Sequence, residues 1–187
     1  MRIWKEKEGF GPELIAQLKK RSRKADPQVD AAVAEIIARV RGDGDKAVAA
    51  YTKKFDGALP EKVELSKDEM RESAAECGGD FLSALRRAAE NIRDFHERQK
   101  QQSWFETRPD GVIMGQRIRG LSRVGIYVPG GTAAYPSSVL MNAIPAKIAG
   151  VGEIVMATPP ARGGRPNPPI MAAALEAGVD RVFQVGG

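Results

Sequence analysis

The last third of the sequence carries the pattern that most restricts the fold of this chain. Three short apolar segments alternate there with two longer segments in which apolar residues recur at helical spacing: residues 122–128, 137–148, 153–157, 170–177 and 181–185. Strands separated by helices pair in parallel, because a helical crossover carries the chain back to the same edge of the sheet. We therefore expect parallel βαβ units with right-handed crossovers.

Capping and breaking residues mark the helix limits in this region. Ser137 or Ser138 is the expected cap of the first helix, and Gly178 should end the second. A further strand is expected over residues 111–119. The sequence stops at Gly187, directly after a strand, so we expect the sheet to be incomplete.

In the first hundred residues the apolar positions recur every three or four residues, which predicts helices. The strongest example follows Asp26-Pro27, an N-cap residue with proline at the first helical position. Ser66 and Glu69 have the spacing of a capping box. A long helix is expected over residues 81–102, and strands are expected only after Gly111.

The composition indicates a soluble globular protein, with 42% hydrophobic and 28% charged residues. No stretch approaches the roughly 20 apolar residues that a membrane span needs, and the start of the sequence has no apolar core of signal-peptide length. The single cysteine, Cys77, cannot form an internal disulfide, which agrees with a reducing compartment. We therefore predict a cytoplasmic protein that does not enter a membrane.

The net charge of +5 raises the question of nucleic-acid binding. The densest basic run, residues 19–24, lies at the end of a predicted helix, where positive charge complements the helix dipole. No aromatic residues interleave this run to stack on bases. We favour a solvated helix end over a nucleic-acid site.

A complete zinc centre is not expected within this chain. His96 is its only histidine and Cys77 its only cysteine, and the two lie far apart in the sequence. We interpret His96 as a packing or hydrogen-bonding residue, and Cys77, next to Glu76, as an inert thiol. No metal ligand is assigned.

The segment Val124–Thr132, with the sequence VGIYVPGGT, is the most informative for function. A buried strand delivers Tyr127, and Pro129 and Gly130 then turn the chain at the carboxyl end of the strand, where open α/β sheets bind ligands. Glycines at such a turn let backbone N–H groups approach a phosphate or a sugar. The segment does not make the G-x-G-x-x-G pattern, so a ligand loop and a plain strand-to-helix turn both stay open.

Residues 125–150, with the sequence GIYVPGGTAAYPSSVLMNAIPAKIAG, resemble the corresponding segment of histidinol dehydrogenases almost residue for residue. Other segments resemble that family in the same order: residues 41–51, Phe55-Asp56, residues 91–99 and residues 182–187. The resemblance spans essentially the whole chain and corresponds to the N-terminal portion of the family.

Periodicity and resemblance together predict an α/β fold. Residues 1–105 form a helical N-terminal region, and residues 106–187 form an incomplete parallel βαβαβ sheet of Rossmann-like type. The resemblance implies that this second region is the first part of an NAD-binding domain, truncated at its C-terminal end.

The resemblance implies an enzyme that oxidises L-histidinol to L-histidine, the last steps of histidine biosynthesis, in two hydride transfers to NAD through an aldehyde. It also implies a homodimer, a zinc ion that holds the substrate, and a Glu–His pair that handles protons. The zinc ligands and the base are expected in the half that this sequence lacks, so the chain alone is expected to be inactive. The alternative is a stand-alone, non-catalytic module for nucleotide binding or assembly.

By the same resemblance, Tyr127 matches the tyrosine that contacts NAD in the family, and Pro129 and Gly130 adjoin it. No catalytic residue is assigned. Strand alternation supports an accessible Tyr127 ring, because the apolar residues of the strand fall on the opposite face: Val124, Ile126 and Val128.

Other candidates are interpreted as structural residues. The helical spacing of Phe55 favours the core, and Asp56, like Ser137 and Ser138, is interpreted as a helix cap. Gln184 is not the glutamine that contacts NAD in the family, because that residue would follow Gly187.

Overall fold

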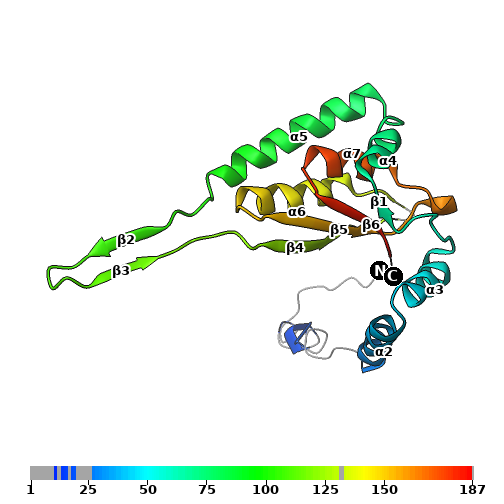
Figure 1. Ribbon diagram of the computed structural model, residues 1–187, viewed down its shortest axis with the longest axis horizontal. Helices are drawn as coiled ribbons and strands as arrows, with labels where there is room; N and C mark the ends of the chain where they lie inside the picture. The colour runs from blue at the N-terminus through cyan, green and yellow to red at the C-terminus, as the bar shows by residue number, and fades with distance from the viewer. Residues whose placement is uncertain (1–10, 12–13, 17, 20–26, 131–132, 187) are drawn as a thin grey trace. The chain divides into compact units, whose positions relative to one another are not determined.

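The computed structural model describes residues 11, 14–16, 18–19, 27–130 and 133–186 (Figure 1). The chain divides into two compact units, residues 1–48 and 49–187. Helix α2 (Pro27–Asp43) lies in the first unit, and α3 (Asp45–Asp56) begins there and continues into the second. Asp26, the expected cap of α2, lies outside the described residues, but the helix begins at Pro27 as the sequence predicts.

Helix α2 has the apolar face that its periodicity predicts, but it buries none of its residues. Val29, Val33 and Ile37 are all exposed. Periodicity shows which side of a helix is apolar, whereas burial needs another element against that side. Within the described residues, nothing covers this face.

The second unit holds a four-stranded sheet in the order β1-β6-β5-β4. Strands β4 (Arg123–Tyr127), β5 (Glu153–Thr158) and β6 (Arg181–Gln184) are parallel, as predicted. Strand β1 (Glu64–Leu65) pairs antiparallel with β6. It lies inside the region expected to be helical, where two residues are too few to give a strand period.

Helix α6 (Pro136–Ile148) connects β4 to β5, and α7 (Pro168–Glu176) connects β5 to β6. With α4 (Lys67–Ala74) and α5 (Gly79–Glu97), they gather on one side of the sheet (Figure 1). The side chains of β5 alternate between buried and half-buried, and Ile154 and Met156 belong to the core. The core therefore lies between one face of the sheet and these helices.

The ends of the helices follow local sequence rules in part. Ser66 and Glu69 form the predicted capping box, and Gly178 follows α7 with a φ of 73°. The prediction that Ser137 or Ser138 caps α6 is wrong, because the helix begins one residue earlier, at Pro136. No side chain caps it, since the cap position is Tyr135.

A two-stranded antiparallel hairpin, β2 (Trp104–Thr107) and β3 (Ile113–Gln116), lies between α5 and β4. The expectation that strands begin only after Gly111 is wrong here as well as at β1, and α5 ends at Glu97 rather than near residue 102. Every residue of both hairpin strands is exposed. With no core face, the hairpin lacks the alternation by which β2 could have been recognised.

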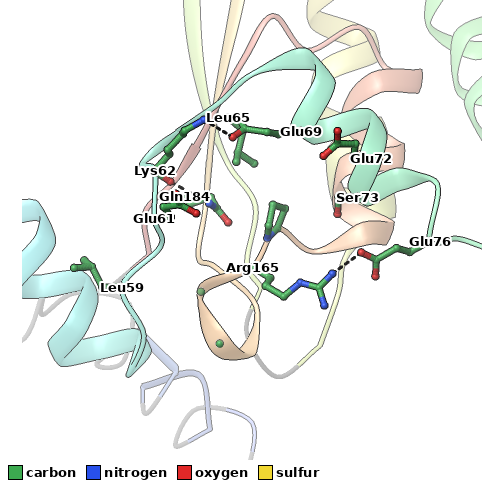
Figure 2. Close-up of a pocket in the computed structure, with 13 residues that line it drawn as sticks. Leu59, Glu61, Lys62, Leu65, Glu69, Glu72, Ser73, Glu76, Arg165 and Gln184 are labelled. Carbon is green, nitrogen blue, oxygen red and sulfur yellow. Dashed lines mark hydrogen bonds and ion pairs between the residues drawn. The ribbon is translucent and has the colours of Figure 1, made fainter.

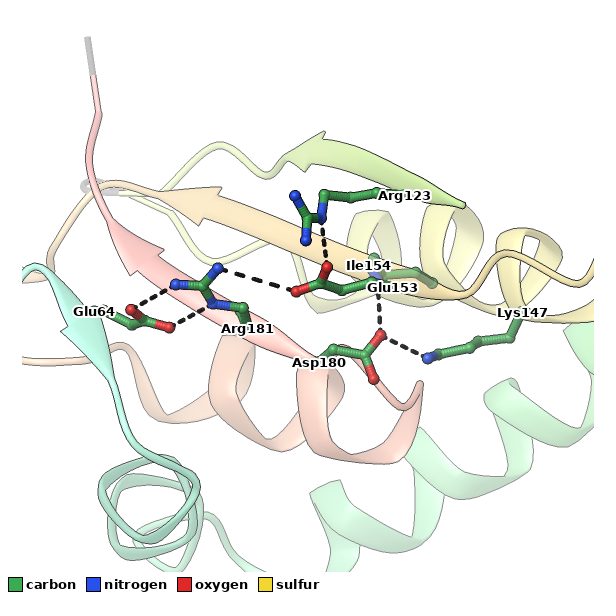
Figure 3. A network of polar contacts seen from close by, with 7 residues as sticks. All are labelled: Glu64, Arg123, Lys147, Glu153, Ile154, Asp180 and Arg181. Carbon is green, nitrogen blue, oxygen red and sulfur yellow. Dashed lines mark hydrogen bonds and ion pairs between the residues drawn. The ribbon is translucent and has the colours of Figure 1, made fainter. Parts of the chain in front are cut away.

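Charged side chains connect the four strands (Figure 3). Arg181 on β6 donates to both carboxylate oxygens of Glu64 on β1, at 2.7 and 2.9 Å, and lies 4.0 Å from Glu153 on β5. Glu153 in turn pairs with Arg123 on β4. The bidentate pair orients β1, whose two residues provide little pairing of their own.

Asp180 joins the start of β6 to β5 and α6. One carboxylate oxygen accepts the Lys147 ammonium and the backbone N–H of Ile154, each at 2.7 Å (Figure 3). Burial raises the pKa of Asp180, but these two donors outweigh it, so its pKa lies below its usual value of 3.8. The ionised carboxylate thus stabilises the fold.

Replacing Asp180 with alanine should lower the free energy of unfolding at neutral pH by about 1–2 kcal/mol, because the Ile154 N–H loses its acceptor. Because the pKa of Asp180 is depressed in the fold, this stabilisation is present above the unfolded value and is lost as the pH falls through the folded value. Urea unfolding at a series of pH values measures both effects. Arg123→Ala is the control, since it removes only a surface pair worth less than about 1 kcal/mol. Equal losses in the two variants would contradict the account.

Candidate functional site

The carboxyl ends of the three parallel strands meet at one edge of the sheet. Tyr127 ends β4 opposite Ala157, and Thr158 ends β5 opposite Gln184 of β6. The backbone N–H of Val128 donates to the carbonyl of Ala157 at 2.9 Å, which carries the pairing one residue past β4. The chain then leaves each strand in a turn, so side chains and backbone groups from three turns share this edge.

Tyr127 lies on the accessible face of β4. Its side chain is 51% exposed, whereas Val124 and Ile126 pack against the core and Val128 is buried. This is the alternation that the sequence predicts, so Tyr127 is not a core residue. Partial burial and the nearby Asp56 carboxylate raise the pKa of its phenol above its usual value.

The turn after Tyr127 packs on the end of β5. Pro129 is exposed and Gly130 is half-buried. A Cβ atom on Gly130 would lie 3.1 Å from Cγ of Pro159 and 3.3 Å from Oγ1 of Thr158. A glycine fits at position 130 because the two turns approach each other closely there, and not because the backbone has a positive φ.

Asp56 belongs to this edge, although the sequence predicts a helix cap there and not a site residue. It is the last residue of α3, so its interpretation as a helix cap is wrong. The backbone N–H of Gly186, in the turn after β6, donates to its carboxylate. Burial raises the pKa of Asp56 against this hydrogen bond, so its ionised form is disfavoured relative to water.

Two buried oxygen atoms at the edge have no hydrogen-bond partner within the described part of the chain. They are Oδ2 of Asp56 and Oγ1 of Thr158. A Cβ atom on Gly186 would lie 2.8 Å from Oδ2 of Asp56, so the glycine keeps space beside that oxygen. Buried polar atoms without partners are rare in folded proteins. The edge can therefore accept hydrogen bonds from the hydroxyl groups of a ligand.

The other candidate residues lie elsewhere. His96 on α5 hydrogen-bonds through Nδ1 to Oε1 of Gln99 at 2.7 Å, which confirms its interpretation as a hydrogen-bonding residue. Burial and the adjacent Glu76 raise the pKa of the Cys77 thiol, which agrees with an inert cysteine. Gln184 is buried, and its amide nitrogen donates to the carbonyl of Lys62 at 3.1 Å.

The expectation that Phe55 lies in the core is wrong. Its side chain is 47% exposed, and its ring stacks on Tyr51 with the ring centres 5.7 Å apart. Helical spacing places Phe55 on the same side of α3 as Tyr51, but α3 ends one residue later, at Asp56. The ring is therefore covered mainly on the side of Tyr51.

Among the residues that the structure describes, no three His, Cys, Asp or Glu side chains lie together so as to hold a metal ion. None of the helices in the described part of the chain is long and apolar enough to cross a membrane.

Comparison with known proteins identifies relatives over most of the chain. The family model for histidinol dehydrogenase matches residues 19–187. A histidinol dehydrogenase from Clostridium acetobutylicum is 47% identical over 177 residues, which are 95% of this chain and 41% of the relative. One from Geobacillus kaustophilus is 49% identical over 156 residues, which are 83% of this chain and 37% of the relative.

A solved structure is similar as well. The crystal structure of histidinol dehydrogenase from Elizabethkingia anophelis superimposes with a TM-score of 0.81 at 34% sequence identity, covering 88% of this chain and 38% of the other. The chain therefore spans about two fifths of the length of the proteins it matches. On the family match and these identities, the chain belongs to the histidinol dehydrogenase family.

Proposed function

We propose that this chain is the N-terminal part of an NAD- and zinc-dependent histidinol dehydrogenase, which oxidises L-histidinol to L-histidine through the aldehyde. Its own role in that enzyme is to hold NAD at the carboxyl edge of the sheet. This role rests on one observation: a half-exposed tyrosine lies at that edge, near buried oxygens that have no hydrogen-bond partner among the described residues. Family membership supports the choice of cofactor.

The residues at the edge fit a dinucleotide. Tyr127 offers an aromatic face and a hydroxyl group, and Pro129 and Gly130 form the turn beside it. Oδ2 of Asp56 and Oγ1 of Thr158 can accept hydrogen bonds from sugar hydroxyls, as an acidic residue does in many dinucleotide sites. Bound NAD supplies the acceptor for hydride. The chain's residues hold NAD in position, with the phenol of Tyr127 available as a hydrogen-bond donor.

The described residues do not fit the zinc site of such an enzyme, because they bring no three suitable side chains together. In this proposal the zinc ligands and the proton-transferring residues belong to the part of the relatives that this chain does not match. From the same family resemblance, we also propose that the enzyme is a homodimer and is cytoplasmic.

The purified 187-residue chain should not form NADH from histidinol, even with NAD and zinc present, because its described residues form no metal-binding cluster and we place the zinc ligands and the base in the unmatched part of the relatives. The absorbance of NADH measures this, and the histidinol dehydrogenase of Clostridium acetobutylicum is the positive control. Zinc-dependent NADH formation by metal-analysed chain would disprove the proposed division of labour.

Tyr127→Ala should weaken NAD binding about five- to thirtyfold, or about 1–2 kcal/mol, and histidinol binding less. The variant is made in this chain completed with the unmatched remainder of the Clostridium acetobutylicum relative, and both dissociation constants are measured by titration. Tyr135→Ala is the matched control, because Tyr135 is 48% exposed in the same segment. Unchanged NAD affinity with a large fall in melting temperature would mean that Tyr127 is a packing residue.

Asp56→Asn should weaken NAD binding while it stabilises the ligand-free chain at neutral pH. Because the pKa of Asp56 is raised in the fold, its contribution to stability is complete below the unfolded pKa and is lost as the pH rises through the folded pKa. Asparagine cannot ionise but can still accept the N–H of Gly186. Urea unfolding should show a stability gain at neutral pH that disappears as the pH falls below the unfolded pKa. The exposed Asp94→Asn is the control; a pH-independent gain would refute the burial argument.

A further inference from the structure

A cavity of about 450 Å³ lies beside α4 (Figure 2). Its walls are one face of α4 with the turn that follows, residues 59–62, residues 163–166, and Gln184 at the end of β6. None of the residues assigned to NAD lines it. The cavity is therefore a separate candidate site in the second unit.

The spacing along α4 explains one wall. Glu72 and Ser73 follow Glu69 by three and four residues on α4, so they face the same side as Glu69, and Glu76 lies in the turn after the helix. Gly164 closes the opposite side. It has a φ of 78°, and a Cβ atom there would lie 2.9 Å from the carbonyl oxygen of Leu59. A glycine at this position thus lets two loops meet across the cavity.

The charges that line the cavity do not cancel. Lys62 pairs with Glu69 at 2.8 Å, and Arg165 pairs with Glu76 at 2.6 Å. Lys62 and Ser66 hold the pKa of Glu69 at about 2, so this carboxylate stays ionised. The other two lining carboxylates, Glu61 and Glu72, have no ion pair with any described residue. The cavity keeps an excess of negative charge after its internal pairs are formed.

Two buried oxygen atoms in the lining have no hydrogen-bond partner among the residues described. Oγ of Ser73 belongs to a residue that is 6% exposed, and Oε1 of Gln184 to one that is 3% exposed. The amide nitrogen of Gln184 already donates to the carbonyl of Lys62, so the oxygen is the free end of that amide. An amide oxygen can only accept, which calls for a donor on the occupant.

We propose that this cavity binds a small organic cation whose ammonium or similar N–H group donates to Gln184 and Ser73. Among the described lining residues, four carboxylates stand against two cationic side chains, and this excess of negative charge favours a cation and disfavours an anion. An apolar occupant would leave both buried oxygens unsatisfied. The volume lies in the range of small-molecule sites. The cavity shares no residue with those assigned to NAD, although Gln184 ends β6 at the same edge of the sheet.

The test uses the 187-residue chain and three probes of equal carbon length: 1,4-diaminobutane, uncharged 1,4-butanediol and anionic succinate. Backbone amide shifts are followed by NMR during each titration. The diamine should give saturable shifts at residues 72–76, 163–165 and 184, with a dissociation constant at least about tenfold below that of the diol. Succinate should give none.

Glu72→Gln should weaken diamine binding about fivefold or more, whereas Asp94→Asn, which removes an exposed carboxylate of α5, should leave it unchanged. Gln184→Met should weaken it as well, and if that buried substitution impairs folding, Glu72→Gln alone decides. Added NAD should not displace the diamine. Shifts only outside the cavity, equal binding of diol and diamine, an unaffected Glu72→Gln variant, or displacement by NAD would each overturn the proposal.

Discussion

The parallel pairing of β4, β5 and β6 is the constraint on which the rest of the second unit depends. Parallel neighbours need crossovers, and α6 and α7 supply them. The two helices pack on the sheet through buried residues such as Val139, Ile144 and Ile170. The same pairing brings the three carboxyl ends to one edge, so the turns after the strands become neighbours. The proposed NAD edge is thus a consequence of strand direction.

Helices whose apolar residues recur over several turns, and strands whose residues alternate strictly, were predictable from the sequence. Both crossover helices, the three parallel strands and the capping box at Ser66 were recognised, because each follows from local spacing. The accessible position of Tyr127 also followed from alternation along β4. Strand β1 was missed because two residues are too few to show a strand period, and β2 because its four residues are all exposed.

The parts that could not be predicted depend on contacts between distant segments. Asp56 reaches Gly186 only because α3 ends beside the turn after β6. The cavity beside α4 likewise joins Ser73 and Gln184, which no motif connects. Phe55 shows the reverse case, in which correct helical spacing did not lead to burial. The spacing of apolar residues shows which face of a helix or strand is apolar, whereas the element that packs against this face depends on the tertiary structure.

The proposed function requires NAD to bind at the carboxyl edge of this sheet. A crystal structure of the chain, completed with the remainder of the Clostridium acetobutylicum relative and grown with NAD, tests it most directly. We expect the cofactor to lie against the ring of Tyr127, with its hydroxyl groups within hydrogen-bonding distance of Asp56 or Thr158. A cofactor bound elsewhere, with the oxygens of Asp56 and Thr158 satisfied by protein groups instead, would contradict it.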